Sequence, residues 1–426
     1  MGSVSVRLGV LASYLAARHR RFADRDALLA WQQPRLQGAL HRARVRFPGY
    51  RGVTDDDLAA FPLMDRGTWL DGFSGLNDRG LSLEECLAAA RDAEAGRSFG
   101  TTLRGVSVGL STGTSGRQGA FLTSPAERSR WAGTLLAKAL PGDLLAGARI
   151  ALILRAGGPL YASVGSSRIR FTFIDLYAPA EQQRAELLAF APTVLAAPPV
   201  LLDQLATARA RGGLPISPAA VYSIADVLDP DVAARIRAGF GVGVGQVYQA
   251  TEGFLGITCA HGTLHLNEDL LHFEREEVGG GRFTPVVTDL FRTTQAIIRY
   301  RIGDVLHPSA AACPCGSPLQ AIDRIEGRDD DVLRLARAAG GTAPCFADLV
   351  RGLVLGTAGV VDFHLEQDAP HHLRLAVSPD AAWPAAAAAL ASGLAAAGFV
   401  VPTIGPAGFA PPDPTRKRRR VSRSWR

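Results

Sequence analysis

The chain has 426 residues, of which 47% are hydrophobic and 20% are charged, and its formal net charge is +6. This length suits one large domain or two smaller ones, and the balance of apolar and charged residues excludes a disordered chain. Seven positive residues and no negative residue lie in 416–426, so the rest of the chain carries a net charge of −1. The basic charge therefore belongs to a C-terminal tail and not to a basic body that binds a polyanion.

The cysteine and hydropathy patterns indicate a cytoplasmic protein. Five cysteines, an odd number, argue against a disulfide scaffold. Residues 1–21 predict an amphipathic helix, because the short apolar run ends in charge and lacks the cleavage site of a signal peptide. The longest uncharged stretch, 381–412, is rich in alanine and broken by prolines and glycines, which predicts a helix followed by a strand and no membrane span.

Hydrophobic periodicity distinguishes three regions up to residue 305, and strand-like runs on either side of an alanine-rich helix mark a fourth after residue 327. In residues 1–100, apolar residues recur every three or four positions, which predicts helices. From Arg149 to about residue 250, short β-rich runs alternate with helical segments, which predicts a mostly parallel sheet covered on both faces. Residues 263–305 predict antiparallel strands of a β-subdomain. The expected fold is therefore α/β, with a large N-terminal domain over 1–326 and a small α+β domain over 327–426.

A segment rich in glycine and hydroxyl groups, GLSTGTSG over 109–116, indicates a phosphate-binding loop. It is not the P-loop of nucleotide triphosphatases, because that loop ends in Gly-Lys and no Gly-Lys pair occurs in this chain. Apolar runs at 106–110 and 120–122 predict a strand on either side, which favours a phosphate loop over a flexible linker. The candidate residues are Ser111, Thr112, Gly113, Thr114, Ser115 and Gly116.

Four motifs in order resemble the core motifs of the adenylate-forming superfamily, which includes acyl-CoA ligases and adenylation domains. They are STGTSG from residue 111, QVYQATEG from 246, RYRIGD from 299 and GRDDD from 327. The chain is most similar to the phenylacetate–CoA ligase branch, especially the clade related to synthetases that adenylylate a deazaflavin coenzyme. Phrases such as CAHGTLHLNED and CPCGSP support this, and the resemblance runs from about Phe61 to Val421.

The resemblance implies that ATP and Mg²⁺ activate a carboxylic acid, aryl or acyl, to an acyl-adenylate. The acyl group then passes to a thiol, either CoA or the thiol of a carrier protein. In this scheme residues 111–116 cradle phosphates, Thr251 contacts phosphate and Glu252 holds Mg²⁺. Tyr248 stacks on adenine, with the backbone of Ser223 to Asp226 on the other side.

The same resemblance assigns residues to the ribose and to a hinge. Asp304 accepts both ribose hydroxyls, since a carboxylate is a bidentate acceptor. Arg328 supports the ribose–phosphate side, and Asp330 is the hinge between the domains. The family loop often carries a lysine where this chain has Gly119, which is a departure that bears on phosphate affinity.

Lys417 aligns with the mobile catalytic lysine that the family places near its C-terminus. Only Lys138 and Lys417 are lysines among 46 basic residues, so chance would put a lysine at one named basic position about 4% of the time. A compact ammonium differs from a planar guanidinium, and arginine would be a poor substitute between a carboxylate and an α-phosphate. The alternative is a generic solvated basic tail.

Two pairs of soft ligands, separated by about fifty residues, suggest a structural zinc site. Three thiolates and one imidazole would make a closed tetrahedral centre, and four protein ligands leave no position for catalysis. Related ligases of this branch look similar here. The alternative is that the thiols are free. The predicted ligands are Cys259, His265, Cys313 and Cys315, with His261 as the substitute imidazole.

The acyl pocket and the acceptor are less constrained by the sequence. Arg155, Tyr161 and Arg168 lie in the region where the pocket is expected, although surface arginines are the simpler interpretation of two of them. One alternative function is a stand-alone adenylating enzyme or an adenylyltransferase that serves a non-CoA acceptor. A non-enzymatic binder of nucleic acid or anionic membrane ranks last, because the body is near neutral. The acid, the acceptor and the oligomeric state stay open.

Overall fold

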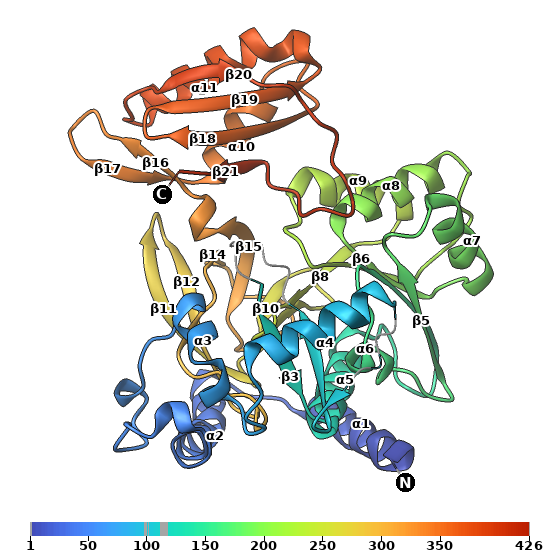
Figure 1. The fold of residues 1–426 in the computed structure, drawn as a ribbon. Helices are drawn as coiled ribbons and strands as arrows, with labels where there is room; N and C mark the ends of the chain where they lie inside the picture. Colours follow the sequence, from blue (N-terminus) through green and yellow to red (C-terminus); the bar gives the residue numbers. More distant parts are fainter. Residues whose placement is uncertain (1, 98–99, 101, 111–117, 426) are drawn as a thin grey trace. The chain divides into compact units, whose positions relative to one another are not determined.

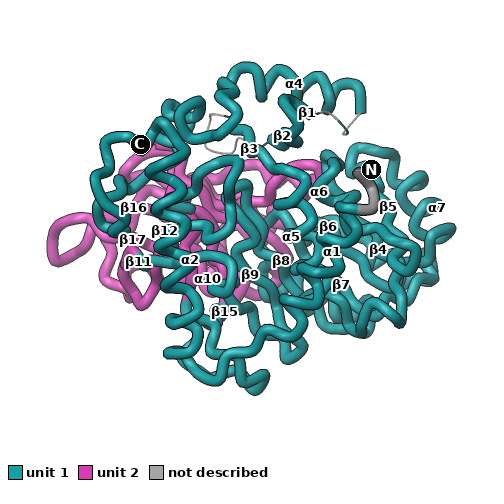
Figure 2. The backbone as a smooth tube through the Cα atoms, turned by 90° about the horizontal axis from the view of Figure 1, so that it is seen from below, with its two compact units in different colours: residues 1–275, 285–302, 308–323 teal, residues 276–284, 303–307, 324–426 magenta. Residues whose placement is uncertain are grey.

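The computed structural model describes residues 2–97, 100, 102–110 and 118–425. It divides the chain into two units, each of which is described by itself (Figure 2). Unit 1 consists of residues 1–275, 285–302 and 308–323, and unit 2 consists of residues 276–284, 303–307 and 324–426. The predicted domain boundary after residue 326 and the mobility of the C-terminal domain stay predictions.

Helices account for most of the described residues up to Arg97, as the periodicity predicts (Figure 1). The Asp24 side chain accepts a hydrogen bond from the Ala27 amide at the start of the second helix, and a Ser82–Glu85 capping box starts the fourth. The helices are α1 (Gly2–His19), α2 (Arg25–Arg46), α3 (Arg66–Asp71) and α4 (Leu83–Ala95), with 3₁₀ turns at Pro48–Tyr50, Leu58–Ala60 and Phe73–Leu76.

The parallel sheet predicted from Arg149 onward is confirmed. Its five strands run in the order β5-β4-β6-β7-β8, and every neighbouring pair is parallel. The strands are β4 (Ala148–Leu154), β5 (Ile169–Asp175), β6 (Val194–Ala197), β7 (Ala220–Ile224) and β8 (Val244–Gln249). The helices among them are α6 (Pro159–Ala162), α7 (Ala180–Phe190), α8 (Pro199–Ala210) and α9 (Pro230–Phe240).

Alternate residues of these strands pack on opposite faces of the sheet, so both faces are covered. Leu195 and Val221 belong to the core built with α7, α8 and α9. Their neighbours Val194 and Ala220 belong to the core built with α1 and α5 (Pro125–Ala139). The two helices of that second layer approach closely at Gly133, where an added Cβ would lie 2.4 Å from the Val10 carbonyl oxygen.

Antiparallel strands follow, as predicted for residues 263–305. Pairing of β8 with β9, β9 with β10, and β10 with the start of β15 extends the sheet of unit 1. The strands are β9 (Phe254–Thr258), β10 (Leu264–Leu266), β11 (Leu271–Gly279), β12 (Arg282–Asp289), β13 (Tyr300–Arg301), β14 (Asp304–Pro308) and β15 (Ala321–Arg328).

A separate antiparallel sheet flanks the predicted phosphate loop. Its strands are β1 (Thr102–Leu103), β2 (Val106–Leu110) and β3 (Ala120–Thr123), paired in that order. The prediction of a strand on either side of the loop is therefore confirmed. The six loop candidates themselves, 111–116, lie outside the described residues.

Unit 2 contains the small α+β module expected after residue 327. Its four-stranded sheet has the order β20-β19-β18-β21, and α10 and α11 contribute to its buried core. The elements are β16 (Leu333–Ala336), β17 (Thr342–Cys345), α10 (Ala347–Leu355), β18 (Asp362–Ala369), β19 (His372–Ser378), α11 (Trp383–Ala396), β20 (Thr403–Pro406) and β21 (Val421–Arg423).

The uncharged stretch 381–412 folds as a helix and then a strand, which confirms that prediction. Pro384 lies in the first turn of α11, where its missing N–H costs nothing. The strand begins only at Thr403, because Pro402 cannot donate to a β-ladder. Within the described part of the chain, no helix is long and apolar enough to cross a membrane.

Candidate active site and metal centre

Four of the predicted ATP-site residues of unit 1 gather at one edge of its sheet. β7 and β8 are parallel neighbours, and Ser223 and Tyr248 lie near their carboxyl ends. Thr251 and Glu252 follow directly in the turn between β8 and β9. The carboxyl ends of parallel strands are where α/β sheets usually bind ligands. The structure therefore brings Ser223, Tyr248, Thr251 and Glu252 together by topology.

The turn between β8 and β9 is closed by two backbone hydrogen bonds. The Ala250 amide donates to the Gly253 carbonyl at 3.0 Å, and the Gly253 amide donates to the Ala250 carbonyl at 3.3 Å. Glu252, at the tip, is only 8% exposed. A mostly buried carboxylate requires a cationic partner or hydrogen-bond donors. A metal ion that also binds phosphate would be such a partner, so the position of Glu252 suits this role.

Ser223 is the most buried of these residues, at 2% exposure. Its hydroxyl has no hydrogen-bond partner among the described residues. Two positions later the backbone turns sharply, since Ala225 has a φ of +67°. Burying a hydroxyl without a hydrogen-bond partner costs free energy. A ligand bound at this edge of the sheet could supply that partner, so the position of Ser223 fits a binding site.

In unit 2 the predicted ribose anchor and its supporting arginine are in contact. Arg328 Nη1 lies 3.2 Å from Asp304 Oδ1, and the Asp329 amide donates to the Gly303 carbonyl at 2.8 Å. Gly303 has a φ of +75°, and a Cβ there would lie 2.9 Å from the Arg328 guanidinium. The positive φ favours glycine at this position of the RYRIGD motif, because residues with a Cβ rarely adopt this conformation. Asp330 is exposed in the adjoining 3₁₀ turn.

Lys417 is exposed, but the arginines after it belong to the fold of unit 2. Arg418 and Arg420 both pair with Asp362, the latter at 3.0 Å, and Arg419 pairs with Asp331 at 2.9 Å. Strand β21 then pairs in parallel with β18. These three arginines therefore do not form a solvated basic tail, because each of them pairs with a carboxylate of unit 2.

Replacement of Asp362 by asparagine is expected to loosen this end of unit 2. Arg420 is 6% exposed, so the variant removes the Asp362 charge from beside a buried cation, at a cost of about 2 kcal/mol. Hydrogen exchange of the β18 and β21 amides should therefore become faster. Asp413→Asn is the matched control, because Asp413 is exposed and lies 3.7 Å from an exposed arginine, Arg416. Equal exchange rates in the two variants would contradict the anchoring role.

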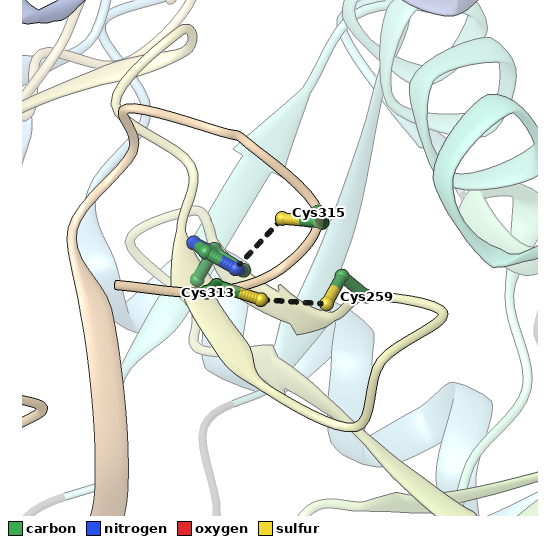
Figure 3. Close-up of side chains that lie close together, drawn as sticks. Cys259, Cys313 and Cys315 are labelled. Carbon is green, nitrogen blue, oxygen red and sulfur yellow. Dashed lines mark hydrogen bonds between the residues drawn. The ribbon is translucent and has the colours of Figure 1, made fainter. Parts of the chain in front are cut away.

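The structure brings the four predicted zinc ligands into one cluster in unit 1. Their ligand atoms all lie within 4.8 Å of one another. Cys259 Sγ lies 3.6 Å from Cys313 Sγ, and Cys315 Sγ lies 3.4 Å from His265 Nε2. A tetrahedral zinc with Zn–S of about 2.3 Å and Zn–N of about 2.0 Å separates its ligand atoms by about 3.5–3.8 Å. The donor set therefore fits zinc, and the Cys259–Cys313 and Cys315–His265 distances are close to this spacing, while the other pairs lie within 4.8 Å. Figure 3 shows the three cysteines, which come from two different loops.

Hydrogen bonds orient His265 and lower the pKa of Cys313, whereas the pKa of Cys315 is raised. His265 Nδ1 lies 3.0 Å from the Leu319 carbonyl, which can only accept, so Nδ1 carries the proton and Nε2 presents its lone pair to the cysteines. Burial opposes ionisation of Cys313, yet hydrogen bonds, the largest with the Thr263 side chain, lower the pKa of its thiol to about 6. Burial raises the pKa of Cys315 to about 11. His261 is exposed, and the cluster found among the described residues contains His265 instead.

The three residues suggested for the acyl pocket have different surroundings. Arg168 is exposed and donates to the Leu145 carbonyl at 3.3 Å. The Arg155 carbonyl accepts a hydrogen bond from the Arg97 side chain. Tyr161 packs edge-on against Trp131, with ring centroids 5.7 Å apart, and burial raises the pKa of its phenol. Of these three residues, Tyr161 is therefore the one connected to the turn of Thr251 and Glu252, through Trp131 and Gln249.

Sequence reasoning missed three residues that support this turn, two by direct hydrogen bonds and Trp131 through Gln249. Trp131 donates its indole N–H to Gln249 Oε1 at 2.8 Å, and Gln249 donates to the Ala250 and Gly253 carbonyls at 2.8 and 2.9 Å. Arg292 donates to the Thr251 carbonyl at 2.9 Å. Gln249 lies in the motif QVYQATEG, and Trp131 lies in AERSRWAG (126–133), another phrase that resembles the family, but neither segment indicated a role for these two side chains. Arg292 lies outside these segments.

The chain has the fold of adenylate-forming enzymes. It resembles a 2-hydroxyisobutyryl-CoA ligase in complex with R3-HIB-AMP, with a TM-score of 0.64 and 17% identity over 94% of this chain and 89% of that chain. It also resembles the anthranilate CoA ligase AuaEII in complex with anthranoyl-AMP, with a TM-score of 0.52 and 13% identity over 73% and 65% of the two chains. A third match is GH3.15 acyl acid amido synthetase, with a TM-score of 0.53 and 14% identity over 84% and 81%.

These similarities are similarities of fold. No protein-family model and no curated protein sequence matches the chain. Two of the three solved structures are acyl- or aryl-CoA ligases that carry an acyl-adenylate. The expected α/β architecture is therefore confirmed, and the activity rests on the residues of this chain.

Proposed function

We propose that this chain is an AMP-forming acid–thiol ligase. It would activate a carboxylic acid with ATP and Mg²⁺ to an acyl-adenylate and transfer the acyl group to a thiol such as CoA. The observation that carries the proposal is the gathering of Ser223, Tyr248, Thr251 and Glu252 at the carboxyl edge of the parallel sheet. The fold it shares with solved acyl- and aryl-CoA ligases supports the reaction class.

The proposed roles in unit 1 follow from the chemistry of each side chain. Tyr248 offers an aromatic face to adenine, and Ser223 a buried hydroxyl beside it. Thr251 contacts a phosphate oxygen, and Glu252 supplies a carboxylate oxygen, which Mg²⁺ prefers as a ligand. The loop 111–116, between β2 and β3, cradles the phosphates with backbone amides and hydroxyls.

In unit 2, Asp304 would accept the two ribose hydroxyls while Arg328 keeps that carboxylate oriented. Lys417 would place its ammonium between the acid carboxylate and the α-phosphate during adenylation. Asp330 would be the hinge that lets the small domain move between the two half-reactions.

The finer family assignment is part of the proposal. The motifs resemble those of the phenylacetate–CoA ligase branch and its deazaflavin-related clade, and a structural zinc held by Cys259, His265, Cys313 and Cys315 would agree with that branch. The zinc would be structural, because four protein ligands leave it no open position. We expect a cytoplasmic enzyme.

Pyrophosphate release against a panel of aryl and acyl acids, with mass spectrometry of acyl-AMP, tests the proposal. A ligase forms acyl-AMP with one class of acid and turns over faster when CoA is added. Turnover that is independent of CoA would favour the stand-alone adenylating enzyme or adenylyltransferase. Absence of acid-dependent pyrophosphate release across the panel would contradict the proposed activity.

A further inference from the structure

Helix α5 begins two residues after β3, the strand that leaves the predicted phosphate loop. Two of its side chains, Glu127 and Trp131, are four residues apart and therefore share one face of the helix. Trp131 hydrogen-bonds to Gln249, the residue before the Ala250–Gly253 turn that carries Thr251 and Glu252. Glu127 hydrogen-bonds to the segment that follows Arg292, whose side chain contacts this turn. All of these residues belong to unit 1.

The first connection runs through Trp131 and Gln249. The Trp131 indole N–H donates to Gln249 Oε1 at 2.8 Å, which fixes the orientation of the amide group. Gln249 Nε2 then donates to the carbonyls at both ends of the turn, Ala250 at 2.8 Å and Gly253 at 2.9 Å. The Gln249 side-chain amide therefore bridges the two ends of the turn, and Thr251 and Glu252 lie between them.

The second connection runs through Glu127 and Arg292. Glu127 Oε1 accepts from the Thr293 and Thr294 amides at 2.7 and 3.0 Å, which fixes the segment after Arg292. Burial opposes ionisation of Glu127, but the hydrogen bond from the Thr293 backbone and the charge of Arg292 keep its pKa below the ordinary value. Arg292 Nη2 donates to the Thr251 carbonyl at 2.9 Å.

Arg292 also reaches the strand after the phosphate loop. Its Nη1 donates to Gln295 Oε1 at 3.3 Å, and the same oxygen accepts from the Leu122 amide of β3 at 3.0 Å. Gln295 is fully buried, so these bonds are shielded from water. Arg292 therefore joins β3 to the carbonyl of the very residue expected to contact phosphate.

We propose that Trp131, Gln249 and Arg292 are positioning residues that hold the Thr251–Glu252 turn at a fixed place relative to the strand leaving the phosphate loop. Neither Trp131 nor Gln249 would touch the reacting atoms, and Arg292 would act through the Thr251 backbone. The inference deepens the proposed function, since it assumes that Thr251 and Glu252 bind phosphate and Mg²⁺. If the Thr251 and Glu252 side chains are already held in place, less conformational entropy is lost when phosphate and Mg²⁺ bind, and binding is tighter.

The test uses Gln249→Met, Trp131→Phe and Arg292→Met in the full chain, with two readouts. Without nucleotide, hydrogen exchange of the Ala250 and Gly253 amides reports on the turn itself, and it should become faster in all three variants. Titration of Mg²⁺ at saturating ATP should give a half-saturating concentration raised by about fivefold for each hydrogen bond lost. The affinity for the acid should change little.

Two matched controls separate positioning from general damage. Trp383→Phe removes an indole hydrogen bond to the Leu375 carbonyl in unit 2, and Arg130→Met removes a hydrogen bond to the Phe291 carbonyl from the same helix α5. Both should leave the turn and the Mg²⁺ titration unchanged. Trp131→Phe combined with Gln249→Met should cost less than the sum of the single changes, because both act through one amide group.

The outcomes are distinguishable from failure of the proposed activity. Unchanged exchange at Ala250 and Gly253 in all three variants overturns the positioning network. Faster exchange with an unchanged Mg²⁺ titration overturns its role in binding. If the unmodified chain neither binds Mg²⁺ with ATP nor releases pyrophosphate with any acid, the proposed function fails, while the exchange data still decide whether the turn is held by these side chains.

Discussion

Replacement of Lys417 by alanine is expected to slow acyl-adenylate formation by about 10²–10³-fold while ATP still binds. The ammonium would stabilise charge that develops between the acid carboxylate and the α-phosphate, so its loss raises the barrier to that step. Lys417 is exposed and the arginines after it anchor the chain, so the substitution should not disturb the fold. Mass spectrometry of acyl-AMP measures the rate, and calorimetry with ATP measures binding.

Arg416→Ala is the matched control for this prediction. Arg416 is the preceding residue, is also exposed and carries the same charge. It should keep its activity, which would exclude a general effect of tail charge. Lys417→Arg should stay slow, because a planar guanidinium does not replace a compact ammonium between two anions. Acyl-AMP formation at the unmodified rate in Lys417→Ala would remove this lysine from the mechanism.

The elements that were predictable are those whose signal is local. The strands β4 to β8 are apolar runs separated by helices, and a parallel sheet buried on both faces is the simplest way to pack them. The strands around the phosphate loop and the helix of the uncharged stretch are likewise visible in the order of apolar residues, prolines and glycines. The residues of the adenylate-forming motifs could be named because each motif is a short continuous segment of sequence. Their roles stay predictions.

What could not be predicted depends on contacts between distant residues. Trp131 and Gln249 are 118 positions apart, and nothing in the sequence around a tryptophan on a helix indicates which amide its N–H will meet. The same holds for the C-terminal arginines, whose sequence alone suggests solvated side chains. In the structure Arg418 and Arg420 pair with Asp362, which lies more than fifty positions earlier in the chain. Charge runs can be located from sequence, but their partners cannot.

The other lysine illustrates a buried contact of this kind. Lys138 lies near the end of α5 and donates to Asp269 at 2.7 Å and to Asn267 at 2.8 Å. Asp269 is buried, and it also accepts from Arg20 at 3.0 Å. Burial opposes ionisation there, but the nearby Lys138 and Arg20 charges lower the pKa of Asp269. The rarity of lysine therefore draws attention to both Lys138 and Lys417. The structure distinguishes them, because Lys138 pairs with the buried Asp269 whereas Lys417 is exposed.

Removal of the metal is expected to destabilise unit 1. Purified protein should contain about one zinc ion per chain, and Cys313→Ser should lose it, because three remaining ligands bind zinc far more weakly. A metal bound at a concentration of about 100 times its Kd stabilises a fold by about 2.7 kcal/mol, so a strong chelator should lower the melting temperature by about 5 °C or more. Elemental analysis and thermal unfolding measure the two effects.

The two histidines of the hairpin after Cys259 provide the sharpest control. His265 faces the thiols with Nε2 and is oriented by the Leu319 carbonyl, whereas His261 is exposed. His265→Ala should therefore lose zinc and stability, and His261→Ala should keep both. Cys86→Ala should keep its zinc even if it unfolds earlier, because Cys86 is a buried thiol outside the cluster of described ligands. Equal zinc contents in His261→Ala and His265→Ala would argue against the tetrahedral site, since only one of these imidazoles can complete it in this fold.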